Sequence, residues 1–99
     1  MVSQGAPTGD QLLDERALSK LRWRCRRGLL ENDLFIARFF ERFDKILNVR
    51  QAGALGVLMD LSDNDLLDLF LARKSLSQVE ATLDSADSHE ILKMVRETR

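Results

Sequence analysis

The sequence predicts an all-α protein, a single small bundle of about five helices. Apolar residues recur at spacings of three and four, and no convincing stretch alternates apolar with polar residues. The only proline, Pro7, lies near the N-terminus and interrupts no later helix. Ninety-nine residues, 44% of them hydrophobic, are enough for one core. We therefore expect one helical domain at residues 12–99 after a flexible polar leader at residues 1–11.

The first two helices are predicted from two apolar faces. A helix from Leu12 to about Arg26 places four residues on one face: Ala17, Leu18, Leu21 and Cys25. Gly28 is its expected stop, because glycine tolerates the left-handed conformation that ends many helices. The second helix, roughly Asn32 to Leu47, has the strongest stripe in the chain, made of Ile36, Phe39, Phe40, Phe43 and Leu47.

The later helices are predicted mainly from their caps. Asn48 is expected to cap a third helix that buries Ala52, Leu55, Leu58 and Met59. Ser62, followed three residues later by Asp65, predicts a short fourth helix through residues 66–71. Residues 72–88 are ambiguous, with a second possible capping box at residues 77–80. A last helix at about residues 87–98 would pack Ile91, Leu92, Met94 and Val95.

The charge distribution favours a protein partner. The net charge is only −1, yet residues 1–50 carry ten cations and seven anions, while residues 51–99 carry five and nine. Such a polarised molecule is suited to an oriented partner. The isoelectric point of about 5.8 lies far below the value typical of nucleic-acid binders, so we expect no nucleic-acid partner. A helical DNA-binding domain remains an alternative, because a basic helix could contact phosphates.

The sequence indicates neither a catalytic nor a metal site, so an enzyme is not expected. Cys25 and His89 are single residues of their kind, which leaves no disulfide, metal set or catalytic dyad. We expect Cys25 to be a buried apolar residue and His89 a surface residue. Four aspartates at positions 60, 63, 65 and 68 lack the glycine and glutamate of a calcium loop, which favours a solvated helix start. No apolar stretch approaches the roughly 20 residues that span a bilayer, and we expect a cytoplasmic protein.

The most informative segment is a run of six cations at Arg16, Lys20, Arg22, Arg24, Arg26 and Arg27. Trp23 lies about 200° around the helix from Leu21, away from the apolar face. Arg16, Lys20 and Arg27 share the side of Trp23. Because Trp and Arg dominate binding hot spots, this face is predicted to dock a partner. In the alternative, Trp23 packs on a neighbouring helix and the cations are merely solvated.

The residues after this run form a second candidate site. Gly28 would let a partner approach the backbone closely, and Arg27 offers a two-pronged donor to a carboxylate or carbonyl. Glu31 could accept hydrogen bonds from a partner or pair with an arginine. The alternative is structural, with a helix C-cap followed by an acidic residue in the next first turn. The residues alone leave both interpretations open.

Residues 21–33, Leu-Arg-Trp-Arg-Cys-Arg-Arg-Gly-Leu-Leu-Glu-Asn-Asp, resemble the signature of the succinate dehydrogenase FAD-assembly factors, which carry an Arg-Gly-x-x-Glu motif. The likeness continues through Phe39-Phe40-Glu41 and Leu58-Met59-Asp60 and covers most of residues 16–98. The chain departs from the family pattern where Lys20 stands for a frequent arginine, Asn32 for an apolar residue and Leu69 for a common tryptophan. None of these departures touches the central motif.

The resemblance implies a non-enzymatic assembly factor. Such factors bind the flavoprotein subunit of succinate dehydrogenase, or of fumarate reductase in some bacteria, and promote covalent attachment of FAD. Carried over by position, Arg27, Gly28 and Glu31 would contact the flavoprotein, flanked by Trp23, Arg26 and Asp33. FAD would belong to the partner, with none bound stably here, and we expect a bacterial monomer that does not insert into membranes. Because some members are described as antitoxins, a regulatory protein-binding module is an alternative.

Overall fold

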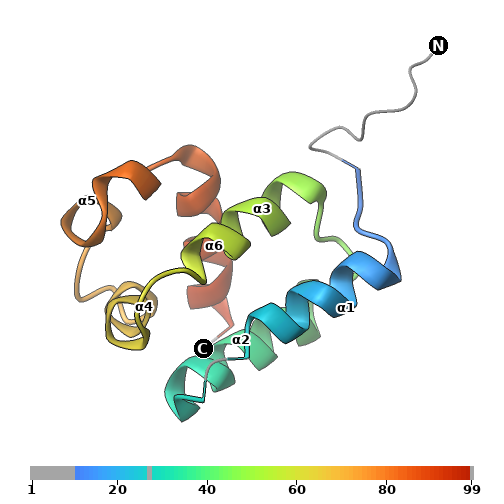
Figure 1. Cartoon of the computed structure of the whole chain (residues 1–99), viewed down its shortest axis with the longest axis horizontal. Helices are drawn as coiled ribbons and strands as arrows, with labels where there is room; N and C mark the ends of the chain where they lie inside the picture. The colour runs from blue at the N-terminus through green and yellow to red at the C-terminus, as the bar shows by residue number, and fades with distance from the viewer. Residues whose placement is uncertain (1–10, 27, 99) are drawn as a thin grey trace.

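The computed structural model describes residues 11–26 and 28–98, and it confirms an all-α bundle (Figure 1). Predictions about residues 1–10 and about Arg27 lie outside these residues. The helices are α1 (Glu15–Arg24), α2 (Leu30–Phe43), α3 (Val49–Leu58), α4 (Asp63–Phe70), α5 (Leu76–Val79) and α6 (Ala86–Glu97), with a 3-10 turn, η1 (Ala81–Leu83), before α6. No helix of the described chain is long and apolar enough to cross a bilayer.

The predicted caps of α3 and α4 are confirmed. The Asn48 side chain accepts a hydrogen bond from the Gln51 amide, and the Gln51 side chain accepts one in return from the Asn48 amide. The Ser62 side chain accepts from the Asp65 amide at the start of α4. These bonds satisfy backbone donors that have no partner inside the helix, which is why the two helices begin there.

The start of α1 was predicted three residues too early. Asp14 caps the helix, its Oδ1 accepting from the Ala17 amide at 2.7 Å. The residues before it are extended instead: Leu12 pairs with Asn48, and the Leu13 amide donates to the Leu47 carbonyl at 3.1 Å. Gln11, the last residue of the predicted leader, accepts from the Val49 amide at 2.9 Å. The chain ahead of α1 is therefore joined to the connection between α2 and α3.

Helix α2 begins two residues before the predicted start and ends four residues before the predicted end. Asn32 lies in its first turn and is fully buried, and its Nδ2 donates to the Asp63 carbonyl at 3.0 Å. No partner within the described residues accompanies Asn32 Oδ1. Leu47 lies beyond the helix but is buried in the core, as expected.

The ambiguous segment contains a short helix whose capping box precedes the predicted one. Ser75 and Gln78 exchange the reciprocal bonds that begin α5, so the box at residues 77–80 was placed two residues too late. Before it, Ala72 adopts a positive φ of 59° as α4 ends. The Arg73 amide donates to the Asp68 carbonyl at 2.8 Å, the six-to-one bond of a left-handed helix terminus.

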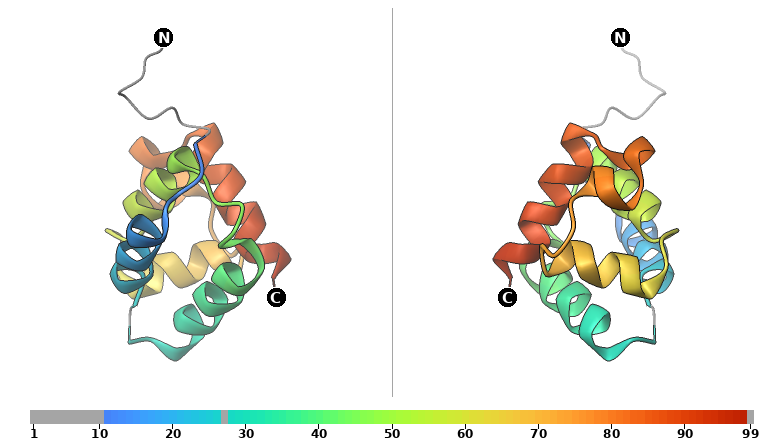
Figure 2. Two further views of the ribbon diagram at one scale, coloured as in Figure 1. Left: turned by 90° about the vertical axis from the view of Figure 1, so that its right-hand side faces the viewer. Right: turned by 90° about the vertical axis from the view of Figure 1, so that its left-hand side faces the viewer.

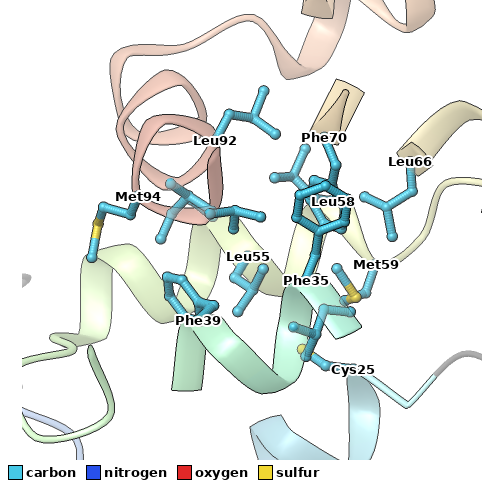
Figure 3. Close-up of a cluster of buried hydrophobic side chains, with 14 of the residues drawn as sticks. Cys25, Phe35, Phe39, Leu55, Leu58, Met59, Leu66, Phe70, Leu92 and Met94 are labelled. Carbon is cyan, nitrogen blue, oxygen red and sulfur yellow. The ribbon is translucent and has the colours of Figure 1, made fainter. Parts of the chain in front are cut away.

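The phenylalanine face of α2 forms the centre of the core, packed against α4 and α6 (Figure 3). Phe35 meets Phe70 of α4 with ring centroids 5.3 Å apart, and Phe39 lies 5.4 Å from Phe40. All five residues of the predicted α2 stripe are buried. Figure 2 shows α1 on one side of this core and α6 on the other.

The long packing contact between α3 and α6 is reinforced by a charged cluster. Arg50 Nη1 donates to Asp87 at 2.7 Å and to Glu90 at 3.0 Å. These bonds, the one to Asp87 first, hold the pKa of Arg50 above its usual value. Two carboxylates at the surface of α6 therefore form ion pairs within the protein.

Replacing Ala72 with glycine is expected to stabilise the protein by about 0.5–1 kcal/mol. Glycine removes the steric cost of a positive φ but gives the unfolded chain more entropy, and the first effect is larger. Denaturation in urea measures the change. Ala37→Gly, inside α2, is the matched control and should cost about 0.5–1 kcal/mol. Equal destabilisation by both changes would contradict the assigned conformation of Ala72.

Candidate functional site

Three consecutive residues of α1 point in different directions. Arg22 pairs at 2.7 Å with Asp44, the C-cap of α2, and Arg24 pairs at 3.0 Å with Asp60, which follows the C-cap of α3. Trp23, between them, is 68% exposed. The prediction that Trp23 faces away from the core is therefore confirmed, and the two flanking arginines tie α1 to its neighbours.

Gly56 of α3 leaves room for the Arg24 side chain, which pairs with Asp60. A Cβ on Gly56 of α3 would lie 3.3 Å from Nη1 of Arg24, closer than most side-chain contacts. Arg22 also lies over the Phe40 ring, with its guanidinium carbon 5.2 Å from the ring centroid. Arg22 and Arg24 of the basic run therefore have partners inside the molecule.

The remaining described cations of the run stay at the surface. The Arg26 guanidinium lies 4.9 Å from the centroid of the Trp23 ring, within the range of a cation–π contact. Arg16 and Lys20 are exposed on the side of α1 that carries Trp23, and neither forms an ion pair within residues 11–26 and 28–98. Trp23, Arg16, Lys20 and Arg26 therefore form an exposed aromatic and basic face, which we call the Trp23 face.

A groove of about 900 Å³ separates α1 from α2 next to this face. Its apolar lining includes Cys25, Ile36 and Phe40, while Trp23 and Arg26 lie on the α1 side. The charged residues of the lining are balanced: Arg22, Arg26 and Lys45 against Asp33, Glu41 and Asp44. The groove thus combines an apolar floor, an exposed aromatic ring and charges of both signs, a composition suited to a protein segment.

Gly28 lies in the connection between α1 and α2 and does not stop α1 as predicted. The helix ends at Arg24 with Cys25 as its C-cap, in right-handed conformation. Gly28 has a φ of +93°, and a Cβ built there would meet no atom within 4 Å. The predicted need for glycine conformation is therefore confirmed, at a position three residues beyond the cap, and the space around Gly28 is open.

The predicted site residues do not all converge. Trp23, Arg26 and Asp33 line the groove, whereas Gly28 and Glu31 are not part of its lining. Glu31 is exposed in the first turn of α2. It precedes Asp33 by two residues and therefore points about 200° away from it around the helix axis. Arg27 lies outside the described residues. The described part of the motif is thus split between the groove and the opposite flank of α2.

Two exposed leucines were not predicted. Leu30 and Leu34 are 68% and 45% exposed, and they lie one turn apart on the outer side of α2. Their spacing relative to the phenylalanine stripe could have identified them, since they fall on the opposite side of the same helix. A pair of exposed large apolar residues near a groove is typical of an interface.

The other candidate residues have structural roles. Cys25 is fully buried, as predicted. His89 is at the surface, as predicted, and pairs with Asp84 at 2.6 Å. The acidic cluster is divided: Asp60 pairs with Arg24, and Asp68 with Arg73 and Lys74. Among the described residues, no three His, Cys, Asp or Glu side chains are grouped to hold a metal ion.

Comparison with known proteins identifies the family. A model of the family described as Sdh5, flavinator of succinate dehydrogenase, matches residues 19–99. This chain belongs to that family. It is similar to a protein of Ralstonia nicotianae named FAD assembly factor SdhE, with 42% identity over 96 residues, 97% of this chain and 98% of the relative.

Further relatives carry the same name. The chain is also similar to a Coxiella burnetii protein named FAD assembly factor SdhE, with 30% identity over 81 residues, 82% of this chain and 90% of the relative. A Vibrio vulnificus protein of that name matches at 41% identity over 49 residues, 48% of this chain and 56% of the relative. No solved structure matches the chain. The resemblance drawn from residues 21–33 is therefore confirmed at the level of the family, whose members are non-catalytic assembly factors.

Replacing Trp23 with alanine is expected to change the free energy of unfolding by less than about 0.5 kcal/mol, because its ring is mostly in solvent. Phe39→Ala, in the core, is the contrasting variant and should cost about 3–5 kcal/mol. Urea denaturation followed by circular dichroism compares the two. A loss of similar size in both variants would show that Trp23 is a structural residue rather than a surface one.

Proposed function

We propose that this flavinator of succinate dehydrogenase binds the flavoprotein subunit through the Trp23 face and the adjoining groove, and so promotes covalent attachment of FAD. The observation that carries the docking surface is the exposed Trp23 ring stacked with Arg26 beside an apolar groove. An aromatic and arginine pair of this kind is the usual centre of a binding hot spot. Leu30 and Leu34 extend the same surface along the outer side of α2.

The proposed action is positioning rather than chemistry. The factor holds the flavoprotein in an arrangement in which its flavin and the accepting side chain meet, and orientation alone can lower a barrier by several kcal/mol, roughly 7–11 at the limit. No stable FAD site is proposed here, and the flavin belongs to the partner. The finer expectations, a monomer in the cytoplasm that also serves a fumarate reductase flavoprotein, belong to the same proposal.

Gly28 and Glu31 are assigned to partner contacts outside the groove, on the connection and on the far flank of the first turn of α2. The open space around Gly28 allows a partner's backbone to approach the connection between the two helices. Glu31 is exposed at the start of α2, where it can accept hydrogen bonds from a partner. Arg27 stands between Arg26 and Gly28 in the sequence and is proposed as a further contact on the strength of the family motif.

The covalent flavin on the succinate dehydrogenase flavoprotein subunit is the decisive readout, measured as fluorescence of the denatured subunit in a gel. We expect the signal to require this protein and to fall when Glu31 is replaced by alanine, because a contact to the partner is lost. Glu97→Ala, an exposed glutamate at the end of α6, is the matched control and should keep the full signal. A signal that is the same with and without the protein would refute the proposed function for this flavoprotein.

Two substitutions of Gly28 distinguish the role of its backbone conformation from the role of the open space around it. Gly28→Ala and Gly28→Arg both force an L-amino acid into the left-handed backbone conformation, at a cost of about 1–2 kcal/mol. Only arginine adds bulk in the open space where the partner is proposed to approach. We expect similar melting temperatures for the two variants but loss of the covalent flavin signal only with arginine. Equal loss of signal in both would assign Gly28 to the shape of the connection alone.

A further inference from the structure

In the connection between α1 and α2, the backbone amides of Arg26 and Gly28 both donate hydrogen bonds. The Arg26 amide donates to the Trp23 carbonyl at 3.2 Å, in the last turn of α1. The Gly28 amide donates to Asp33 Oδ2, also at 3.2 Å. The first bond is an ordinary helix end. The second comes from a side chain of α2 that reaches back over the start of its own helix.

This bond lies at a helix start that has no side-chain cap. Leu29, the N-cap residue of α2, has no side chain that accepts a hydrogen bond, unlike Asp14, Asn48, Ser62, Ser75 and Ser85 at the starts of the other α-helices. Asp33 instead takes the amide of the residue before the cap. A carboxylate near a helix N-terminus is also favoured by the partial positive charge there. One side chain thereby joins the first turns of α2 to the connection that precedes it.

We propose that Asp33 is a positioning residue, which sets the Gly28 conformation before the flavoprotein docks. This inference rests on the proposed function and deepens it. Gly28 has open space around it and the broad conformational freedom of glycine, so its φ of +93° needs an interaction that selects it. The Asp33 carboxylate supplies that interaction, and it holds the backbone that leads from the Trp23 face into α2.

Preorganisation gives this bond a functional consequence. A connection that is already shaped loses less conformational entropy on binding, and so the partner is bound more tightly for the same contacts. Asp33 is half-buried and lines the groove, so a direct contact of its charge with the partner is the competing explanation. Asparagine at position 33 distinguishes the two explanations. Its side-chain oxygen can still accept from the Gly28 amide, but it carries no charge for a contact with the partner.

The test compares Asp33→Ala with Asp33→Asn in two measurements. The first is amide hydrogen exchange of Gly28 in the isolated protein, and the second is the dissociation constant for the succinate dehydrogenase flavoprotein subunit. For alanine we expect faster Gly28 exchange and binding weaker by about 10-fold to 100-fold, the range of a lost bond to a charged group. For asparagine we expect most of the protection and most of the affinity to return. Asp65→Ala, in the first turn of α4, is the matched control and should change neither measurement.

Each other outcome overturns the assignment. Unchanged Gly28 exchange in Asp33→Ala would show that the bond does not hold the connection. Protection restored by asparagine without affinity would show that binding depends on the Asp33 charge and not on its bond to Gly28. If the unaltered protein does not bind the flavoprotein, the proposed function fails, and the role of Asp33 in docking fails with it, while the exchange data still report the bond. Circular dichroism confirms that each variant is folded.

Discussion

The burial of the phenylalanine face of α2 is the constraint on which the rest of the structure depends. Phe35, Phe39, Phe40 and Phe43 require apolar partners, and α4 and α6 supply them on one side of the helix. A helix whose apolar face is fixed in this way has no rotational freedom left. The orientation of every other side chain on α2 follows, including Asp33 toward the groove and Leu30 and Leu34 toward solvent.

Helix α1 is attached differently, and the difference creates the candidate site. Leu21 and Cys25 bury a narrow apolar edge, while the ion pairs of Arg22 and Arg24 reach α2 and α3 on either side. Exposed ion pairs contribute little stability, typically below about 1 kcal/mol each, but they do restrict geometry. The helix is thus held near α2 without being packed tightly along it. A groove remains, with Trp23 exposed at its edge.

Local patterns predicted the core and the caps, while contacts between distant residues could not be predicted. The phenylalanine stripe, Asn48 and Ser62 act within one helix, and the exposure of Trp23 follows from helical rotation. The late start of α1 depends on pairing with residues 47–49, and the ion pairs of α1 join residues 22 and 36 positions apart. The burial of Asn32 likewise depends on α4. The internal partners of Arg22 and Arg24 leave no local signal either, so the sequence could not distinguish these two arginines from the cations of the Trp23 face.

The arrangement suits a factor that works by holding a partner. The candidate surface exposes three large apolar residues, Trp23, Leu30 and Leu34. Exposed apolar groups of this kind are unfavourable in water and typically mark a surface that a partner covers. The charges that line the groove are of both signs and nearly balanced, so they contribute more to the orientation of a bound segment than to attraction at a distance. Orientation is also what the chemistry of flavin attachment requires from a protein that supplies no reacting group. The ion pairs of Arg22 and Arg24 hold α1 beside α2 and α3, and Asp33 holds the connection, so that the Trp23 face keeps a defined orientation relative to the groove.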